Sequence, residues 1–241
     1  MMGTIYELVR DAVRNGRSLA TITVLAGGPV GAKMACTPDG QTFGDLGDPT
    51  LTAQAVQAAL PLLAQGETQT VALSPEVMIF VESFAPPPTL FMVGGVHISI
   101  ALAAMAKVVG FRTVVIDARE AFATDERFGH VDELIIAWPD EALAGRLDAR
   151  SSVAVLTHDP KLDDPALRVA LRSPARYIGA LGSPKTHTRR LERLAAEGFT
   201  PEELARIHGP IGLPIGAKTP EEIALSILAE VVQVARQGGR R

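Results

Sequence analysis

The chain has 241 residues, 47% of them hydrophobic, and its 22 glycines and 17 prolines are too few for a disordered low-complexity protein. Its net charge of −4 argues against a general nucleic-acid-binding protein, which would carry a basic surplus. The single cysteine, Cys36, excludes an internal disulfide framework and a cysteine-based zinc or iron–sulfur site within one chain.

The first third of the chain predicts a small α+β domain. Residues 4–16 fit an amphipathic helix, and an alanine-rich helix is predicted over 52–64. Runs typical of strands cover residues 19–25, 32–37, 68–73 and 77–84. Up to Pro88 the chain has four basic and eight acidic residues, whereas the remainder has 19 of each. The acidic excess therefore lies in the first third.

Three consecutive prolines, Pro86 to Pro88, follow this part. Proline fits neither a helix interior nor a central strand, and a run of prolines favours extended polyproline geometry. We therefore expect the prolines to connect two domains, residues 1–87 and 88–241.

After the prolines, strands alternate with helices. Apolar strands are predicted over 90–93, 113–116, 134–137, 153–156 and 177–181, and helices over 97–109, 140–147, 165–171 and 184–196. Thr219-Pro220-Glu221-Glu222 has the residues of a helix N-terminus and begins the last helix. Strands that are apolar throughout are buried on both faces, so the pattern predicts an α/β fold with a Rossmann-like, doubly wound parallel sheet.

The sequence predicts a cytoplasmic protein. The N-terminal residues lack the basic segment and apolar core of a secretory signal. The longest apolar stretch, from Ile98 to Ala106, is well short of the roughly 18–20 residues that a membrane span requires. We therefore expect no membrane span.

The loop after the first strand of the sheet is a candidate cofactor site. Ligands of open parallel sheets bind at the carboxyl ends of the strands. Gly94, Gly95 and His97 lie in this loop, but Val96 stands where a dinucleotide fingerprint requires its second glycine. Asp117 ends the next strand, near the position of a ribose-binding carboxylate. The pattern fits either a nucleotide site or an ordinary tight turn with a strand-end acid.

Two further loops carry polar candidates. Thr157, His158 and Asp159 follow the fourth strand, where His158 and Asp159 fit an acid–base pair, a metal ligand or a substrate anchor. The alternative is a surface turn in which Asp159 caps the next helix. We make no metal-site prediction.

The loop after the fifth strand predicts an anion site. Gly182, Ser183 and Lys185 stand at a predicted helix N-terminus, whose free N–H groups attract anions. Residues 165–193 contain seven basic residues and one acidic residue. This stretch is either a solvated helix face or a positive region suited to a phosphate-bearing ligand.

Taken in order, these segments resemble the xanthine dehydrogenase accessory protein family, of the XdhC/CoxI type. The matching segments are Gly-Gly-Val-His (94–97), Val-Ile-Asp-Ala-Arg (115–119), Glu-Arg-Phe (126–128), Leu-Thr-His-Asp (156–159), Tyr-Ile-Gly-Ala-Leu-Gly-Ser (177–183), Pro-Ile-Gly-Leu-Pro-Ile-Gly-Ala (210–217) and Thr-Pro-Glu-Glu-Ile-Ala-Leu-Ser-Ile-Leu-Ala-Glu (219–230). Two positions depart from the family pattern: Val96 replaces a loop glycine, and Thr50 stands where the family usually has a cysteine. The second departure disfavours a sulfur relay in this chain, and we expect Cys36 to be a small buried hydrophobe.

The resemblance implies a maturation factor for molybdenum hydroxylases rather than a turnover catalyst. Such a protein binds the molybdenum–pterin cofactor (molybdopterin) while a cysteine desulfurase supplies sulfur, then delivers it to an apo-enzyme of the xanthine- or carbon-monoxide-dehydrogenase type. The alternatives are an NAD(P)-dependent oxidoreductase that uses the same cleft and a docking module that acts through the acidic first third. We also expect a homo-oligomer.

Overall fold

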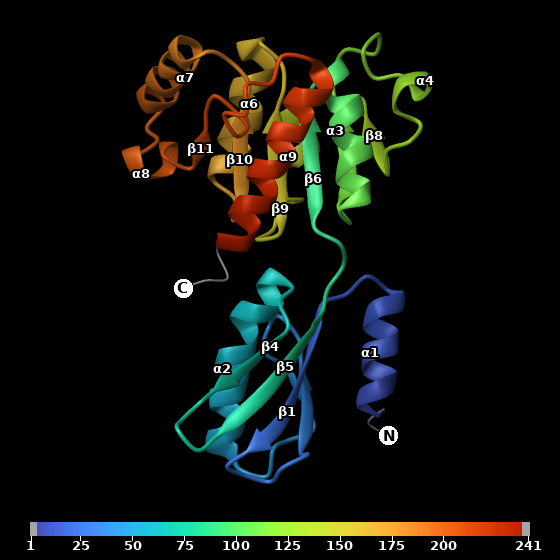
Figure 1. Cartoon of the computed structure of the whole chain (residues 1–241), viewed down its shortest axis with the longest axis vertical. Helices are drawn as coiled ribbons and strands as arrows, with labels where there is room; N and C mark the ends of the chain where they lie inside the picture. The colour runs from blue at the N-terminus through green and yellow to red at the C-terminus, as the bar shows by residue number, and fades with distance from the viewer. Residues whose placement is uncertain (1–3, 238–241) are drawn as a thin grey trace. The chain divides into compact units, whose positions relative to one another are not determined.

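The chain folds into two units, one ending at Pro86 and the other beginning at Pro87, as the computed structural model in Figure 1 shows. The structure describes residues 4–237. Each unit has its own sheet and its own buried core.

The N-terminal unit is an antiparallel sheet with the strand order β3-β2-β1-β5-β4 and a helix on each face. Its strands are β1 (Leu19–Ala26), β2 (Lys33–Cys36), β3 (Thr42–Phe43), β4 (Gln69–Ala72) and β5 (Met78–Phe84), and its helices are α1 (Ile5–Arg14) and α2 (Pro49–Gln65). Helix α2 buries Leu51, Ala55, Ala59 and Leu63, which share one face because they are four residues apart. Helix α1 covers Leu19 and Ala35 from the other side.

Helix α2 begins three residues before the predicted start at 52, because the sequence around Asp48 caps it. The Asp48 carboxylate accepts hydrogen bonds from the N–H groups of Thr50 and Leu51, and Pro49 occupies the first turn. An N-cap aspartate followed by proline is a strong start signal.

The C-terminal unit confirms the predicted Rossmann-like sheet. Its six strands are parallel, in the order β11-β10-β9-β6-β7-β8. The strands are β6 (Thr89–Val93), β7 (Arg112–Ile116), β8 (Glu133–Ile135), β9 (Ser151–Val155), β10 (Tyr177–Ala180) and β11 (Ile207–His208). The helices are α3 (His97–Val108), α4 (Asp125–Phe128), α5 (Pro139–Leu143), α6 (Pro160–Leu171), α7 (Pro184–Ala196), α8 (Pro201–Leu204) and α9 (Pro220–Gln237).

Two apolar layers bury the two faces of this sheet. On one face, α3 and α9 contribute residues such as Leu102 and Ile227, which pack with Met92 of the central strand. On the other face, α5 and α6 pack their apolar residues, including Leu143 and Leu167, with alternate residues of the same strands. In Figure 1, α3 and α9 lie side by side in front of the sheet. None of the helices within residues 4–237 is long and apolar enough to cross a membrane.

Four short elements escaped the sequence interpretation: β3, α4, α8 and β11. Each has four residues or fewer, too short for a periodic apolar pattern. Helix α6 begins at Pro160 rather than at 165, because Asp159 caps it and Pro160 fills its first position. The sixth strand of the parallel sheet, β11, lies in a segment to which the sequence interpretation assigned no element.

Candidate ligand-binding site

Four loops with predicted site residues meet at the carboxyl edge of the parallel sheet. They follow β6, β7, β9 and β10, which are neighbours in the sheet. The chain reverses its direction of winding between β6 and β9, where open α/β sheets bind their ligands. A β-carbon placed on Gly94 would lie 2.6 Å from Thr157 Cγ2, so the loops after β6 and β9 are in direct contact.

Gly94 and Gly95 are buried under the protein's own chain. Gly94 has a φ of +115°, a backbone conformation that residues other than glycine rarely adopt. A β-carbon on Gly95 would lie 2.6 Å from the carbonyl oxygen of Phe122. Internal packing therefore explains both glycines without a ligand, and their role in cofactor binding stays a prediction. His97, the first residue of α3, is exposed at the edge.

Asp117 joins the loops after β6 and β7. Its side chain is completely buried, and its two oxygens accept four hydrogen bonds: from the N–H of Gly95 (2.8 Å), and from the N–H (3.0 Å), Nε (2.9 Å) and Nη2 (2.8 Å) of Arg119. Burial raises the pKa of Asp117, but the hydrogen bonds from Arg119 and Gly95 and the charge of Arg119 together lower it below its ordinary value.

These contacts leave Asp117 with no acceptor position for a ribose hydroxyl, because a carboxylate has about four such positions. The sequence interpretation missed Arg119, which pairs with Asp117 and stacks 4.2 Å from the ring centroid of Phe122. An arginine two residues after a strand-end aspartate was the available signal. The arrangement gives the NAD(P) alternative no support.

In the loop after β9, two of the three predicted residues hold the loop in place and the third is exposed. Asp159 is the N-cap of α6 and accepts a hydrogen bond from the N–H of Lys161 at 3.0 Å, as the surface-turn interpretation requires. Thr157 is buried, and its hydroxyl donates a hydrogen bond to the carboxylate of Asp163 in α6. His158 is exposed at the sheet edge, so it is available to a ligand.

The loop after β10 offers hydrogen-bond donors without acceptors. Ser183 caps α7 by accepting from the N–H of Thr186 at 3.2 Å. Within residues 4–237, the N–H groups of Gly182, Ser183 and Lys185 have no hydrogen-bond acceptor. Lys185 is exposed, and the described part of the chain provides no ion-pair partner for it. Three N–H donors, a hydroxyl and an ammonium group suit a phosphate.

The basic stretch is less positive at its surface than its composition suggests. Arg168 pairs with Glu197, Arg190 with Asp163 and Arg193 with Asp164. These acidic partners lie just outside residues 165–193, so the sequence count omitted them. Positive charge is therefore concentrated on fewer side chains than predicted, with Lys185 at the helix N-terminus.

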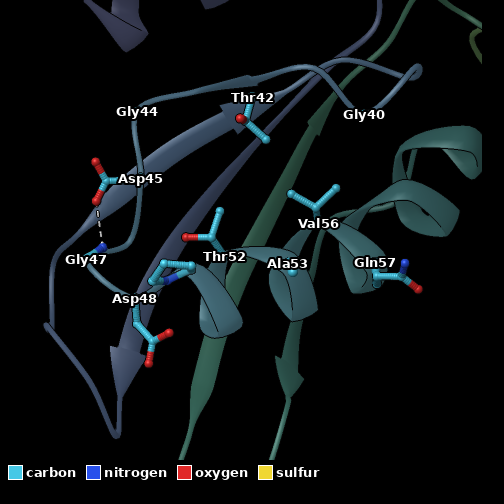
Figure 2. Close-up of a pocket in the computed structure, with 11 residues that line it drawn as sticks. Gly40, Thr42, Gly44, Asp45, Gly47, Asp48, Thr52, Ala53, Val56 and Gln57 are labelled. Carbon is cyan, nitrogen blue, oxygen red and sulfur yellow. Dashed lines mark hydrogen bonds between the residues drawn. The ribbon is translucent and has the colours of Figure 1, made fainter.

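A hollow lies in the N-terminal unit, between the glycine-rich residues 40–48, which include the short strand β3, and the start of α2. It has a volume of about 630 Å³ and is lined by residues that include Thr42, Asp45, Asp48, Thr52 and Gln57. Figure 2 shows Asp45 bonded to the N–H of Gly47, at 2.7 Å. The lining contains two carboxylates and no basic side chain, which disfavours an anion.

The single cysteine of the sequence belongs to the N-terminal unit. Cys36 lies in β2, is fully buried, and packs in the core of the N-terminal unit, as predicted. Burial raises the pKa of its thiol, which keeps the sulfur protonated. Thr50, at the position where the family usually has a cysteine, is exposed in the first turn of α2. Within residues 4–237, no group of three or more His, Cys, Asp or Glu side chains is placed to hold a metal ion.

Family models match both units. Residues 90–231 match the XdhC Rossmann domain, and residues 12–74 match the XdhC and CoxI family. The chain belongs to the XdhC/CoxI family. The predicted family resemblance is therefore confirmed.

Relatives of this XdhC/CoxI-family chain include three curated proteins. It is 29% identical over 96% of its length to a probable xanthine dehydrogenase subunit of Bacillus subtilis (strain 168). It is 33% identical over 65% of its length to "Uncharacterized protein YqeB" of Escherichia coli (strain K12), and 34% over 52% to the "Molybdenum cofactor insertion chaperone PaoD" of the same strain. It spans 65%, 29% and 42% of the lengths of these three proteins.

A solved structure supports the fold along nearly the whole chain. The crystal structure of a xanthine dehydrogenase from Bacillus halodurans is 26% identical, with a TM-score of 0.70 over 97% of this chain and 67% of that one.

Proposed function

We propose that this XdhC/CoxI-family protein binds the molybdenum–pterin cofactor and delivers it to a molybdenum hydroxylase apo-enzyme. The unpartnered N–H groups of Gly182, Ser183 and Lys185 carry this proposal, because they can hold the phosphate of the pterin. The similarity to an E. coli molybdenum cofactor insertion chaperone supports the same cargo. The cofactor is therefore cargo here, and the protein a maturation factor.

The remaining predicted residues border the site in different ways. His97 and His158 are exposed on neighbouring loops, and we propose that both face the bound pterin. Gly94, Gly95 and Asp117 shape the loops from beneath, and Thr157 and Asp159 hold the loop that presents His158. Turnover chemistry by His158 and Asp159 gains no support, because Asp159 caps a helix.

The finer assignments stay predictions. A xanthine- or carbon-monoxide-dehydrogenase-type client and a cysteine desulfurase partner are proposed from the family, and the homo-oligomer from the sequence. Cys36 is unsuited to a sulfur relay because its thiol is buried. We therefore propose that sulfur reaches the bound cofactor directly from the desulfurase, without a cysteine of this chain.

Titration with molybdopterin under anaerobic conditions tests the proposal. We expect micromolar binding, weakened about tenfold or more by Ser183→Ala or Lys185→Ala because each removes a phosphate contact. Arg189→Ala is the matched control, since Arg189 is an exposed cation on the same helix as Lys185. A folded wild-type protein that binds no molybdopterin, or equal losses in all three variants, would contradict the proposal.

A further inference from the structure

Arg190 is a buried cation directly beneath the loop after β10. It lies on α7 and is only 1% exposed. Its Nη2 donates to the carbonyl oxygen of Leu181 at 2.8 Å and to Asp163 Oδ2 at 3.1 Å. Its Nε and Nη1 have no hydrogen-bond partner among the described residues. A buried guanidinium with two unpartnered nitrogens, which carry three N–H groups, is costly, so a packing role alone does not account for it.

The contact with Leu181 sets the direction of the next amide. In a trans peptide the carbonyl and the N–H point in opposite directions. Because the Leu181 carbonyl points to Arg190, the N–H of Gly182 points away from Arg190. Gly182 has a φ of +143°, and a β-carbon there would lie 3.0 Å from Thr186 Cγ2, so glycine suits this peptide orientation.

A chain of side chains joins this loop to the loop after β9. Arg190 pairs with Asp163, and Asp163 accepts the hydroxyl hydrogen bond of Thr157, the residue before His158. All three side chains are buried. The loops that carry Lys185 and His158 are thus tied to one ion pair, although these two residues are 27 positions apart in the sequence.

We propose that Arg190 is a positioning residue of the phosphate site. It holds the Gly182 N–H toward the ligand and fixes the phosphate loop relative to the His158 loop. This inference rests on the proposed function in that the ligand is the phosphate of the bound cofactor. The ion pair with Asp163 balances the formal charge of Arg190, so the proposed role rests on the direction of its hydrogen bonds and on its two unpartnered nitrogens.

The experiment compares Arg190→Lys and Arg190→Gln with Arg189→Gln in the full chain. Arg189→Gln removes the same charge from the adjacent, exposed position. Inorganic phosphate is the probe for binding by calorimetry, and the Gly182 amide is followed by NMR chemical shift and hydrogen exchange in 15N-labelled protein. We expect both Arg190 variants to bind phosphate at least tenfold more weakly and to shift the Gly182 amide, and Arg189→Gln to change affinity less than threefold.

The outcomes separate this inference from the proposed function. A wild-type protein that binds neither phosphate nor molybdopterin contradicts the proposed function. The NMR signal of the Gly182 amide, compared between the ligand-free wild type and the Arg190 variants, still tests the role of Arg190 in that case. A folded Arg190 variant with an unchanged Gly182 amide overturns the inference. If the Arg190 variants do not fold, the role of Arg190 is tested in the wild-type protein by hydrogen exchange at its guanidinium group. Slow hydrogen exchange at the Arg190 guanidinium supports the proposal, and exchange as fast as at Arg189 overturns it.

Discussion

Asp117→Asn provides a sharp test of whether Asp117 is a structural clamp. The carboxylate accepts four hydrogen bonds, two on each oxygen. An asparagine turns one of these acceptors into an NH2 group, which faces two N–H donors in either orientation of the amide. At least two donors therefore lose their partner.

The expected loss of stability is about 2–4 kcal/mol, because each buried unsatisfied donor costs about 1–3 kcal/mol. Two such donors would cost about 2–6 kcal/mol, and we take the lower half of this range because the Arg119 side chain is 38% exposed and can recover hydration. For a unit of this size, the loss corresponds to a fall in Tm of roughly 4–16 °C.

Urea unfolding followed by tryptophan fluorescence measures this loss. Trp138 is the only tryptophan and lies in the C-terminal unit, so its signal reports on the unit that contains Asp117. Glu120→Gln is the control, since it removes one negative charge from an exposed position in the same loop. It should change the free energy of unfolding by less than about 0.5 kcal/mol. An Asp117→Asn protein as stable as the wild type, with lost NAD affinity, would refute the clamp and favour the ribose interpretation.

Three further predictions concern stability. Gly94→Ala should lower the free energy of unfolding in urea by about 2–3 kcal/mol, because of backbone strain at φ +115° and the contact with Thr157. Adding Thr157→Ser to this variant should recover part of the loss, because it removes Cγ2. A Gly94→Ala protein as stable as the wild type would contradict this. Glu230→Ala should lower the free energy of unfolding by about 2–4 kcal/mol, because Glu230 accepts hydrogen bonds from Tyr177 Oη at 2.6 Å and from the N–H of Gly212. Tyr177→Phe removes one of these bonds and should cost about 1 kcal/mol. Equal losses for the two variants in thermal melts would argue against this network. The Arg146 hydrogen bond lowers the pKa of Glu133, so the stability that Glu133 contributes is present above its unfolded pKa near 4.5 and is lost as the pH falls through its folded pKa. Glu133→Gln should therefore flatten the acid part of the curve of stability against pH. An unchanged curve would exclude a contribution from Glu133.

The sheet and its order of elements were predictable because the apolar strands are continuous and the helices between them are well marked. Ser183 and Pro184 predicted the start of α7 correctly, since N-caps and first-turn prolines act locally. Strand β11 was missed because two residues carry no periodic pattern. Helix α6 was predicted too short because Pro165 inside it resembles a helix start.

The candidate site was predictable only where it depends on local sequence. The donors at Gly182, Ser183 and Lys185 follow from a helix N-terminus, and a helix begins there. The partners of Asp117 and Arg190 depend on tertiary contacts. Arg190 does lie four residues before Leu194 on the buried side of α7, and this spacing was the signal for its burial.

Reconstitution of a molybdenum hydroxylase apo-enzyme tests the central claim most directly. The protein is loaded with molybdopterin and molybdate, and active enzyme formed is compared with that from an equal amount of free cofactor. We predict a higher yield of active enzyme with the loaded protein, and loss of that gain with Lys185→Ala but not with Arg189→Ala. Equal yields from the loaded wild-type protein and from free cofactor, with every protein folded, would contradict a role in cofactor delivery.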